Sequence, residues 1–276
     1  MTGQLSPLAQ GKAAGAVAPY GSLVLKTGQT TQYDSELDDG YYEKGVAKSY
    51  TVNTSGAQSG TSNVDLTHLV SDTGAFTSGN KTYTDTEKCG VFKAAGGETI
   101  VISGSASNNG VFTTVSATAN TVVFSEAITD EADAPETTFK KREAISNNTV
   151  LDNNTGLTWL RYFATKLGAA GTGTMPWSGV VYDIFQYCAV ANAATLGGYT
   201  DWRIPNAFEL LTLLDFEYPG GAPPTAIFPS FPTNVWTSSV AVADQTKAKY
   251  IMFTTGQMSE VARTNLFIVP MLVRGG

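Results

Sequence analysis

The chain has 276 residues, which is enough for two modest domains that each bury their own hydrophobic core. Charged residues make up only 15% of the sequence, and Gly, Ser, Thr and Asn take their place, which favours a β-rich and loop-rich structure. The net charge of -7 and the lack of any run of Lys or Arg argue against nucleic acid as a partner.

Residues 1–19 contain few large apolar side chains and no periodic pattern. We therefore expect them to form a flexible arm. They lack the basic start and apolar core of a secretory signal. No segment of the chain approaches the roughly 20 apolar residues that a membrane span needs, so no membrane insertion is expected.

An acidic stretch follows near the start of the next segment, with carboxylates at Asp34, Glu36, Asp38 and Asp39. Such a cluster could hold a calcium ion, because hard cations prefer several oxygen ligands. The spacing of an EF-hand loop is absent, which favours a solvated acidic loop instead. Both interpretations stay open at this point.

Residues 20–142 are predicted to form an N-terminal β-rich domain. Strand-like runs alternate with turn clusters at spacings of roughly 8–12 residues, a pattern typical of an antiparallel sandwich or small barrel. The segment from Glu98 to Glu131 resembles small β-modules of phage and virus structural proteins. His68 lies among apolar neighbours without a nucleophile or a second base, which indicates a core or rim histidine rather than a catalytic one.

The segment 131–147 is charged, contains a proline and lacks a steady period, so we place a domain boundary within it, between residues 142 and 143. The C-terminal domain is then 143–276. It contains all four tryptophans, as expected where a larger mixed core is built. Cys89 and Cys188 fall in different predicted domains, and we interpret both as buried thiols. With one histidine and no CxxC motif, neither a zinc site nor a cofactor is expected.

The C-terminal half carries the clearest helical patterns. One helix is expected to begin near Ser178 and to end near Gly197, because apolar residues recur there at helical spacing. A second is expected after Asn206, which together with Glu209 resembles a capping box ahead of a run of leucines. Short β-like runs follow. The sequence thus predicts an α+β fold in this half, with two helices, small antiparallel sheets and long loops.

Four segments in this half resemble one known family in order and in detail. They read NTVLDNNTGLTWLR, YCAVANAATLGGYTDWRIPNAFELLTLLD, VWTSS and a terminal VRGG. They resemble the Lcl C-terminal-like family, and the resemblance spans most of 149–276. It implies a C-type-lectin-like fold and a ligand-binding or adhesive protein. Several members are targets of diversity-generating retroelements, and their last segment is hypervariable.

The motif residues are predicted to be structural. We expect Arg203 to fork onto backbone carbonyls or onto Asp201 while Trp202 packs inward. The side chains of the DNNTG turn should satisfy backbone donors. The chain ends of C-type-lectin-like folds pair as strands, so the resemblance implies that LTWLR lies beside MLVRGG. The turn residues are Asp152, Asn153, Thr155 and Gly156, and the other scaffold residues are Trp236, Ser238 and Ser239.

Ligand binding is predicted for the surface that these fixed points hold, between residues 240 and 271. Polar and assorted side chains alternate there with apolar ones, so that one strand face would pack and the other would be presented to a ligand. The candidate ligand-binding residues are Lys249, Met252, Thr254, Gln257, Ser259, Glu260, Ala262, Thr264, Asn265, Leu266 and Met271.

The favoured hypothesis is a non-enzymatic receptor-binding or adhesion protein, such as the tip of a viral tail fibre or a displayed surface protein. Its partner would be a protein or glycan on a host or other cell surface, its location a virion or cell surface, and its assembly could be a homotrimer. A calcium-dependent lectin is one alternative, but Ile204-Pro205-Asn206 lacks the carboxylate expected there. A formylglycine-generating-enzyme-like oxidoreductase is another, but it needs two reactive thiols and this domain contains only Cys188.

Overall fold

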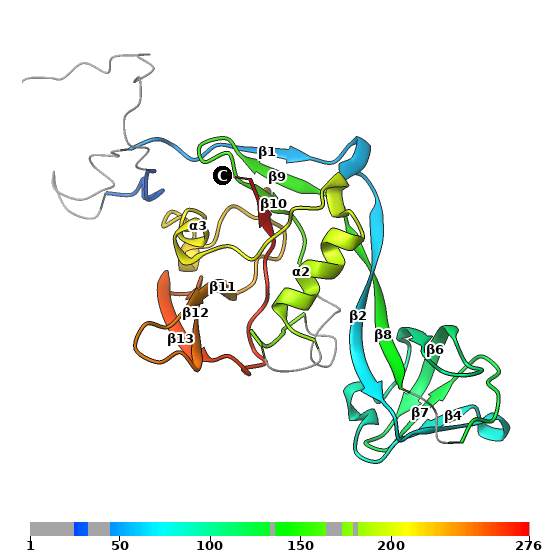
Figure 1. The fold of residues 1–276 in the computed structure, drawn as a ribbon. Helices are drawn as coiled ribbons and strands as arrows, with labels where there is room; N and C mark the ends of the chain where they lie inside the picture. Colours follow the sequence, from blue (N-terminus) through cyan, green and yellow to red (C-terminus); the bar gives the residue numbers. More distant parts are fainter. Residues whose placement is uncertain (1–24, 33–44, 133–135, 164–172, 179–181, 276) are drawn as a thin grey trace, which may run out of the picture.

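The computed structural model describes residues 25–32, 45–132, 136–163, 173–178 and 182–275. Two parts are visible in Figure 1, a larger body and a smaller β-subdomain, and a long two-stranded ribbon joins them. The acidic stretch 34–39 and the expected arm 1–19 lie outside the described residues.

The body contains a four-stranded antiparallel sheet that gathers distant parts of the chain. Its order is β1-β9-β10-β14. Trp159 of β10 lies opposite Val273 of β14, so the predicted pairing of LTWLR with the end of the chain is confirmed. The strands are β1 (Tyr50–Asn53), β9 (Thr149–Asp152), β10 (Thr158–Leu160) and β14 (Val273–Arg274).

The β-subdomain is inserted between β1 and β9. Its two longest strands, β2 (Thr61–Ser71) and β8 (Thr137–Ser146), pair along almost their whole length and form the ribbon. The boundary expected between residues 142 and 143 lies inside β8. The full antiparallel sheet has the order β2-β8-β5-β6-β7-β4-β3, in which the shorter strands are β3 (Ala75–Thr77), β4 (Thr82–Thr84), β5 (Thr99–Ser103), β6 (Gly110–Ala117) and β7 (Thr121–Phe124).

The subdomain and the body have separate cores, but the root of the ribbon belongs to the body. The subdomain core is rich in aromatic and β-branched side chains, among them Phe76, Tyr83 and Phe139. Val64, Leu66 and Ile145, at the other end of the ribbon, pack instead with the body's tryptophans. The buried residues of β2 therefore belong to two cores: those at its start pack in the body, and those near its end pack in the subdomain.

Two α-helices are present among the described residues. The first, α2 (Ile184–Ala193), is capped by Asp183, whose side chain accepts hydrogen bonds from two backbone N–H groups of the first turn. The second, α3 (Ala207–Leu211), has the capping box predicted from Asn206 and Glu209. Short 3-10 turns are η1 (Gly56–Gln58), η2 (Ser78–Asn80), η3 (Cys89–Val91), η5 (Leu196–Gly198) and η6 (Pro219–Gly221). No helix in the described ranges is long and apolar enough to cross a membrane.

A three-stranded antiparallel sheet lies between two cores of the body. It has the order β11 (Asn234–Val240), β12 (Lys247–Met252) and β13 (Gln257–Ala262). Trp236 and Ala248 pack in the core next to α2, whereas Val235 and Ile251 pack in the core next to α3 and the four-stranded sheet. Both faces of β11 and β12 are therefore buried.

The predicted α+β, C-type-lectin-like fold is wrong. The described chain is mostly β, with three antiparallel sheets, and its two α-helices have only ten and five residues. The leucines that suggested a longer second helix continue beyond its end: α3 stops at Leu211, and Leu213 and Leu214 are buried from the turns that follow. A buried apolar stripe can come from turns as well as from a helix, which is why the pattern misled.

His68 lies at the junction of the two parts and is buried, with 2% of its surface exposed. Its Nε2 is 2.5 Å from the carbonyl oxygen of Val91, and its ring stacks on Tyr182 of the body. Burial is the main influence on the pKa of His68 and lowers it, although Val91 and Glu98 act in the opposite direction. The expectation of a core or rim histidine agrees with this environment.

Because the folded protein resists protonation of His68, we expect stability to fall in mild acid. The unfolded chain takes up a proton near pH 6.5, so the stabilisation is complete above that pH and is lost as the pH falls below it. The free energy of unfolding should decrease by up to about 1.4 kcal/mol per pH unit. Urea unfolding between about pH 7.5 and about pH 5.5 measures the decrease.

The control is His68→Gln, which removes the chain's one histidine and should flatten this part of the profile. Equal pH slopes for the two proteins would contradict the assignment.

Candidate functional site

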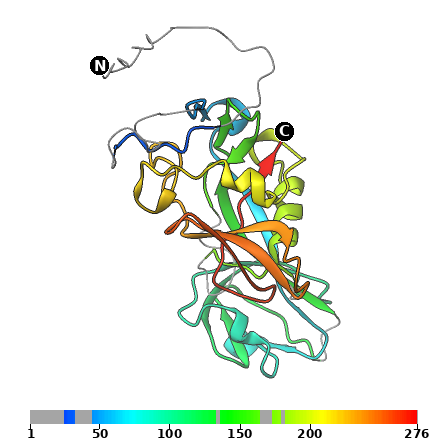
Figure 2. The ribbon, with the colours of Figure 1, turned by 90° about the vertical axis from the view of Figure 1, so that its left-hand side faces the viewer.

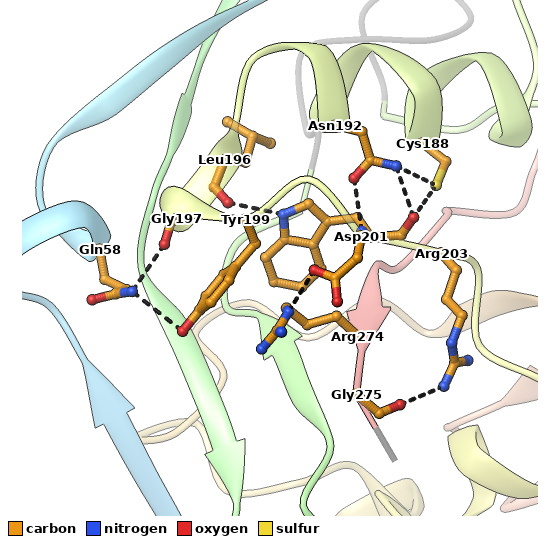
Figure 3. A network of polar contacts seen from close by, with 11 residues as sticks. Gln58, Cys188, Asn192, Leu196, Gly197, Tyr199, Asp201, Arg203, Arg274 and Gly275 are labelled. Carbon is orange, nitrogen blue, oxygen red and sulfur yellow. Dashed lines mark hydrogen bonds and ion pairs between the residues drawn. The ribbon is translucent and has the colours of Figure 1, made fainter.

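The motif GGYTDWR forms a clamp on the body, shown in Figure 3. Trp202 is buried, and its indole N–H donates to the carbonyl of Leu196 at 2.8 Å. The side chain of Asn192 on α2 binds both the N–H and the carbonyl of Trp202, at 2.7 and 2.9 Å. Cys188 donates to the same carbonyl. The helix α2 is thereby fixed to the loop, and the predicted inward packing of Trp202 is confirmed.

Arg203 and Asp201 hold the end of the chain. The guanidinium of Arg203 forms two hydrogen bonds with Glu209, at 2.7 and 2.6 Å, and a third with the carbonyl of Gly275. Of the two predicted kinds of partner for Arg203, a backbone carbonyl is therefore confirmed, whereas Asp201 pairs with Arg274 at 2.7 Å. The Arg274 guanidinium holds the pKa of Asp201 below its usual value. Arg274 also lies over the ring of Tyr199, 3.9 Å from its centroid.

The DNNTG turn and the WTSS segment are structural, as predicted. Asp152 is buried and accepts hydrogen bonds from the backbone N–H of Asn154 and the hydroxyl of Thr155. Trp236 is fully buried, and the hydroxyl of Ser239 accepts from the first backbone N–H of α3. Neither segment presents these groups to a ligand.

The predicted ligand-binding residues do not share one strand face. In the β12–β13 register Lys249 lies opposite Glu260, while Met252 lies opposite Gln257 on the other face of the sheet. Lys249 and Glu260 form an ion pair of 3.8 Å, which contributes little at such an exposed place. The expectation of one packed and one presented face does not hold, because both faces of β12 pack against a core.

Exposure is concentrated instead on the edge strand β13 and on the turns at its two ends. The exposed residues from the predicted set are Thr254, Gln257, Glu260, Ala262, Thr264 and Leu266. Lys249, Met252, Ser259 and Asn265 are half-buried, and the Asn265 side chain accepts from the backbone N–H of Phe267. Met271 is 1% exposed and packs in the core next to the four-stranded sheet, so it is no part of this surface.

Two shallow hollows adjoin the turn between β12 and β13, and Thr254 lines both of them. One, of about 330 Å³, also contains Phe231 and Phe253. The other, of about 410 Å³, contains Phe216 and Tyr218. We call this surface the hairpin-tip face, defined by residues 216–222, 231–233 and 253–257.

Two glycines let the loop 216–221 approach the hairpin turn. A Cβ on Gly220 would lie 2.5 Å from the carbonyl oxygen of Phe253, and its φ of +75° is one that other residues rarely adopt. A Cβ on Gly256 would lie 2.8 Å from the ring of Phe216. The hairpin-tip face thus depends on close backbone contact that a side chain would prevent.

Sequence reasoning missed the aromatic side of this face. Phe216 and Tyr218 are 52% and 42% exposed, and Phe267, in the turn after β13, is 79% exposed. Exposed aromatic side chains are frequent anchors in binding sites because they present a large area with few rotatable bonds. The signal was present in DFEYPGG, where aromatic residues directly precede a Pro-Gly-Gly turn.

The described residues include no cluster of three or more side chains that could hold a metal ion. Burial raises the pKa of the Cys188 thiol to about 11 and that of Cys89 likewise to about 11, so neither is poised as a nucleophile. The arrangement consists of exposed polar and aromatic side chains beside a sheet whose other two strands are packed on both faces.

The architecture is that of a β-rich protein, in which a body with an exposed edge strand carries an inserted β-subdomain. Residues 148–274 match the family model of the Lcl C-terminal domain. The matched range runs from just before β9 into β14, and it supports the resemblance carried by the DNNTG, GGYTDWR and VRGG motifs. The Lcl C-terminal domain is consistent with a surface-associated, binding type of protein. Searches among curated proteins and among solved structures found no match.

We expect Gly220→Ala to destabilise the protein more than an alanine at a glycine with similar φ but free space. Gly97 is the matched control, because its φ is +80° and a Cβ there would meet nothing within 4 Å. Backbone strain alone should cost about 1–2 kcal/mol at either site. Gly220→Ala should cost roughly 1 kcal/mol more, since the loop must move away from Phe253. Equal losses in urea unfolding would contradict the close contact.

Proposed function

We propose that this protein is a non-enzymatic ligand-binding protein that recognises a macromolecule through the hairpin-tip face and the adjoining outer edge of β13. The observation that carries the proposal is the difference in side-chain exposure between the strands of the three-stranded sheet. The strands β11 and β12 are packed on both faces, whereas β13 and its turns present polar side chains beside exposed aromatic ones.

Such a surface suits recognition for two physical reasons. A doubly packed sheet holds its edge rigidly, so little entropy is lost when a partner binds. The side chains of Thr254, Gln257 and Thr264 form no hydrogen bond with any described residue, and they can change without loss of an internal contact. Phe216 and Tyr218 supply the apolar area that fixes a partner in place.

The proposed partner is a protein or glycan of a host or other cell surface, and the proposed location is a virion or cell surface. The family match supports a surface-associated protein. The formal charge of -7 supports a partner other than nucleic acid. The β-subdomain at the end of its ribbon supports an extended, displayed molecule, in which the body can stand away from a support (Figure 1).

To test the site, Gln257, Glu260 and Thr264 are replaced together by Ala in the full chain. The thermal midpoint should stay nearly constant, because exposed substitutions usually change stability by about 0.5 kcal/mol or less each. Binding of the immobilised protein to purified cell-surface extracts should fall about tenfold or more. A collapse of the fold would show that these residues belong to the core.

The matched control replaces Thr77, Thr86 and Ser103, three exposed hydroxyl residues of the β-subdomain. It should bind like the unmodified chain. A loss of binding in the control, with full binding in the first variant, would assign recognition to the β-subdomain and overturn the proposal.

We further propose that the exposed residues of β13 and its turns form the variable part of a diversified protein. Adenine-directed mutation would then replace Gln257, Glu260 and Thr264 and spare Ile251 and Trp236, which are buried. Sequencing the 3′ end of the gene across an uncloned population, together with a search for a near-copy beside a reverse transcriptase, tests this. A uniform 3′ end without such a copy rules it out.

A further inference from the structure

A further pocket, of about 310 Å³, lies beside the loop 215–218. It is enclosed by residues 26–30, by the chain that enters β1, and by the loop with Asp215 and Tyr218. Figure 2 shows the blue segment 25–32 beside the yellow loop. Its volume is near the lower end of small-molecule sites, which span roughly 300–1,000 Å³.

The segment 25–32 is fitted closely to this loop. The backbone N–H of Phe216 donates to the carbonyl of Thr27 at 2.8 Å, and the N–H of Thr30 donates to the carboxylate of Glu217 at 2.6 Å. A Cβ on Gly28 would lie only 1.8 Å from Oδ1 of Asp215, so this wall requires glycine. The pocket is therefore a built feature of the fold.

Two buried donors in the pocket have no hydrogen-bond partner among the residues that the structure describes. They are the Lys48 ammonium and the Tyr50 hydroxyl. The side chain of Lys48 is 9% exposed, and its nearest charged partner, Oδ2 of Asp215, is 4.0 Å away, beyond hydrogen-bond distance. The alternation of an extended chain places residues 48 and 50 on the same side. Unpaired buried donors are costly, so acceptor oxygens are expected to occupy the space between them.

The charged side chains around the pocket indicate which net charge a bound ligand would have. Lys48 has Asp215 and, further back, Asp152 as its negative neighbours, and Lys26 also lines the cavity. A carboxylate ligand would be repelled by the two aspartates and a cationic ligand by the two lysines. A neutral molecule avoids both penalties.

Hydroxyl groups fit this arrangement because each can donate and accept. An oxygen could accept from Lys48 and Tyr50 while its hydrogen is donated to Asp215. Burial raises the pKa of Tyr50, so the phenol keeps its proton and remains a donor. The ring of Tyr218, which is partly exposed, and Pro224 supply apolar walls for C–H groups.

We propose that this pocket binds a neutral polyhydroxylated small molecule of about monosaccharide size, held by Lys48, Tyr50 and Asp215. The inference can be tested separately from the proposed function, because Lys48, Tyr50 and Asp215 lie outside β13 and the hairpin-tip face, and Tyr218 alone borders both sites. It adds a small-molecule site to a chain whose other surface is proposed to bind a macromolecule.

Saturation-transfer NMR on the full chain with glucose, galactose and mannose tests the site. At least one of the three should receive saturation, whereas glucuronate and glucosamine should receive less. Lys48→Met and Tyr50→Phe should each weaken the effect about tenfold, because each removes a donor to the same ligand oxygen. Lys247→Met is the matched control, since Lys247 is a partly exposed lysine of β12 outside the pocket.

The thermal stability of each variant is measured alongside binding, so that a loss of binding can be told from a loss of folding. Lys48→Met replaces a buried ammonium by an apolar chain of similar length, but it leaves the buried Asp215 without its nearest cation, so the thermal midpoint should fall, and sugar binding is measured well below it. Tyr50→Phe removes one oxygen, and it serves alone if the first variant does not fold. No transfer to any neutral sugar would mean that water alone fills the pocket and would overturn the proposal. Equal transfer in wild type and both variants, or a preference for the charged analogues, would overturn it too.

Discussion

The body is held closed by the pairing of Arg203 with Val273, in which each residue's backbone N–H donates to the other's carbonyl at 2.8 and 2.9 Å. This contact brings the end of the chain beside β10 and completes the four-stranded sheet. The Arg203 side chain then ties α3 to the same point through Glu209, and the neighbouring Trp202 ties α2. Both helices and the last strand therefore depend on one loop of three residues.

The second constraint is the burial of both faces of the three-stranded sheet. Packing on each side fixes β11 and β12, and among the three strands of that sheet it is the edge strand β13 that carries freely exposed side chains. Edge strands are also places where another chain could pair, and the charged Glu260 limits such pairing. Side chains of β13 and its turns can therefore be replaced without unfolding the sheet, which would allow the proposed binding specificity to change.

Local features were predictable from the sequence, whereas their assembly was not. The capping box at Asn206 and the inward Trp202 follow from residue types at fixed spacing, the strand pairing at Trp159 was implied by the family resemblance, and the structure contains all three. The overall fold class was wrong, because leucines such as Leu213 are buried from turns and not from a helix. The pairing of β1 with β9 joins residues about a hundred positions apart, and no local pattern encodes such a contact. For the proposed site, polarity selected Gln257 and Glu260, which are exposed, but it also included the buried Met271 and omitted the exposed Phe216.

The ribbon of β2 and β8 has one further consequence. The chain leaves the body after β1 and re-enters it before β9 at neighbouring points, since Asn53 lies opposite Thr149 and Thr61 lies opposite Ser146. A segment whose two ends are adjacent can be lengthened, shortened or exchanged without altering the path of the remaining polypeptide. Replacing the β-subdomain at this junction would attach a longer, shorter or different domain to the same body. The residues of the ribbon nearest the body, with Val64 and Ile145, must be retained because they pack in its core.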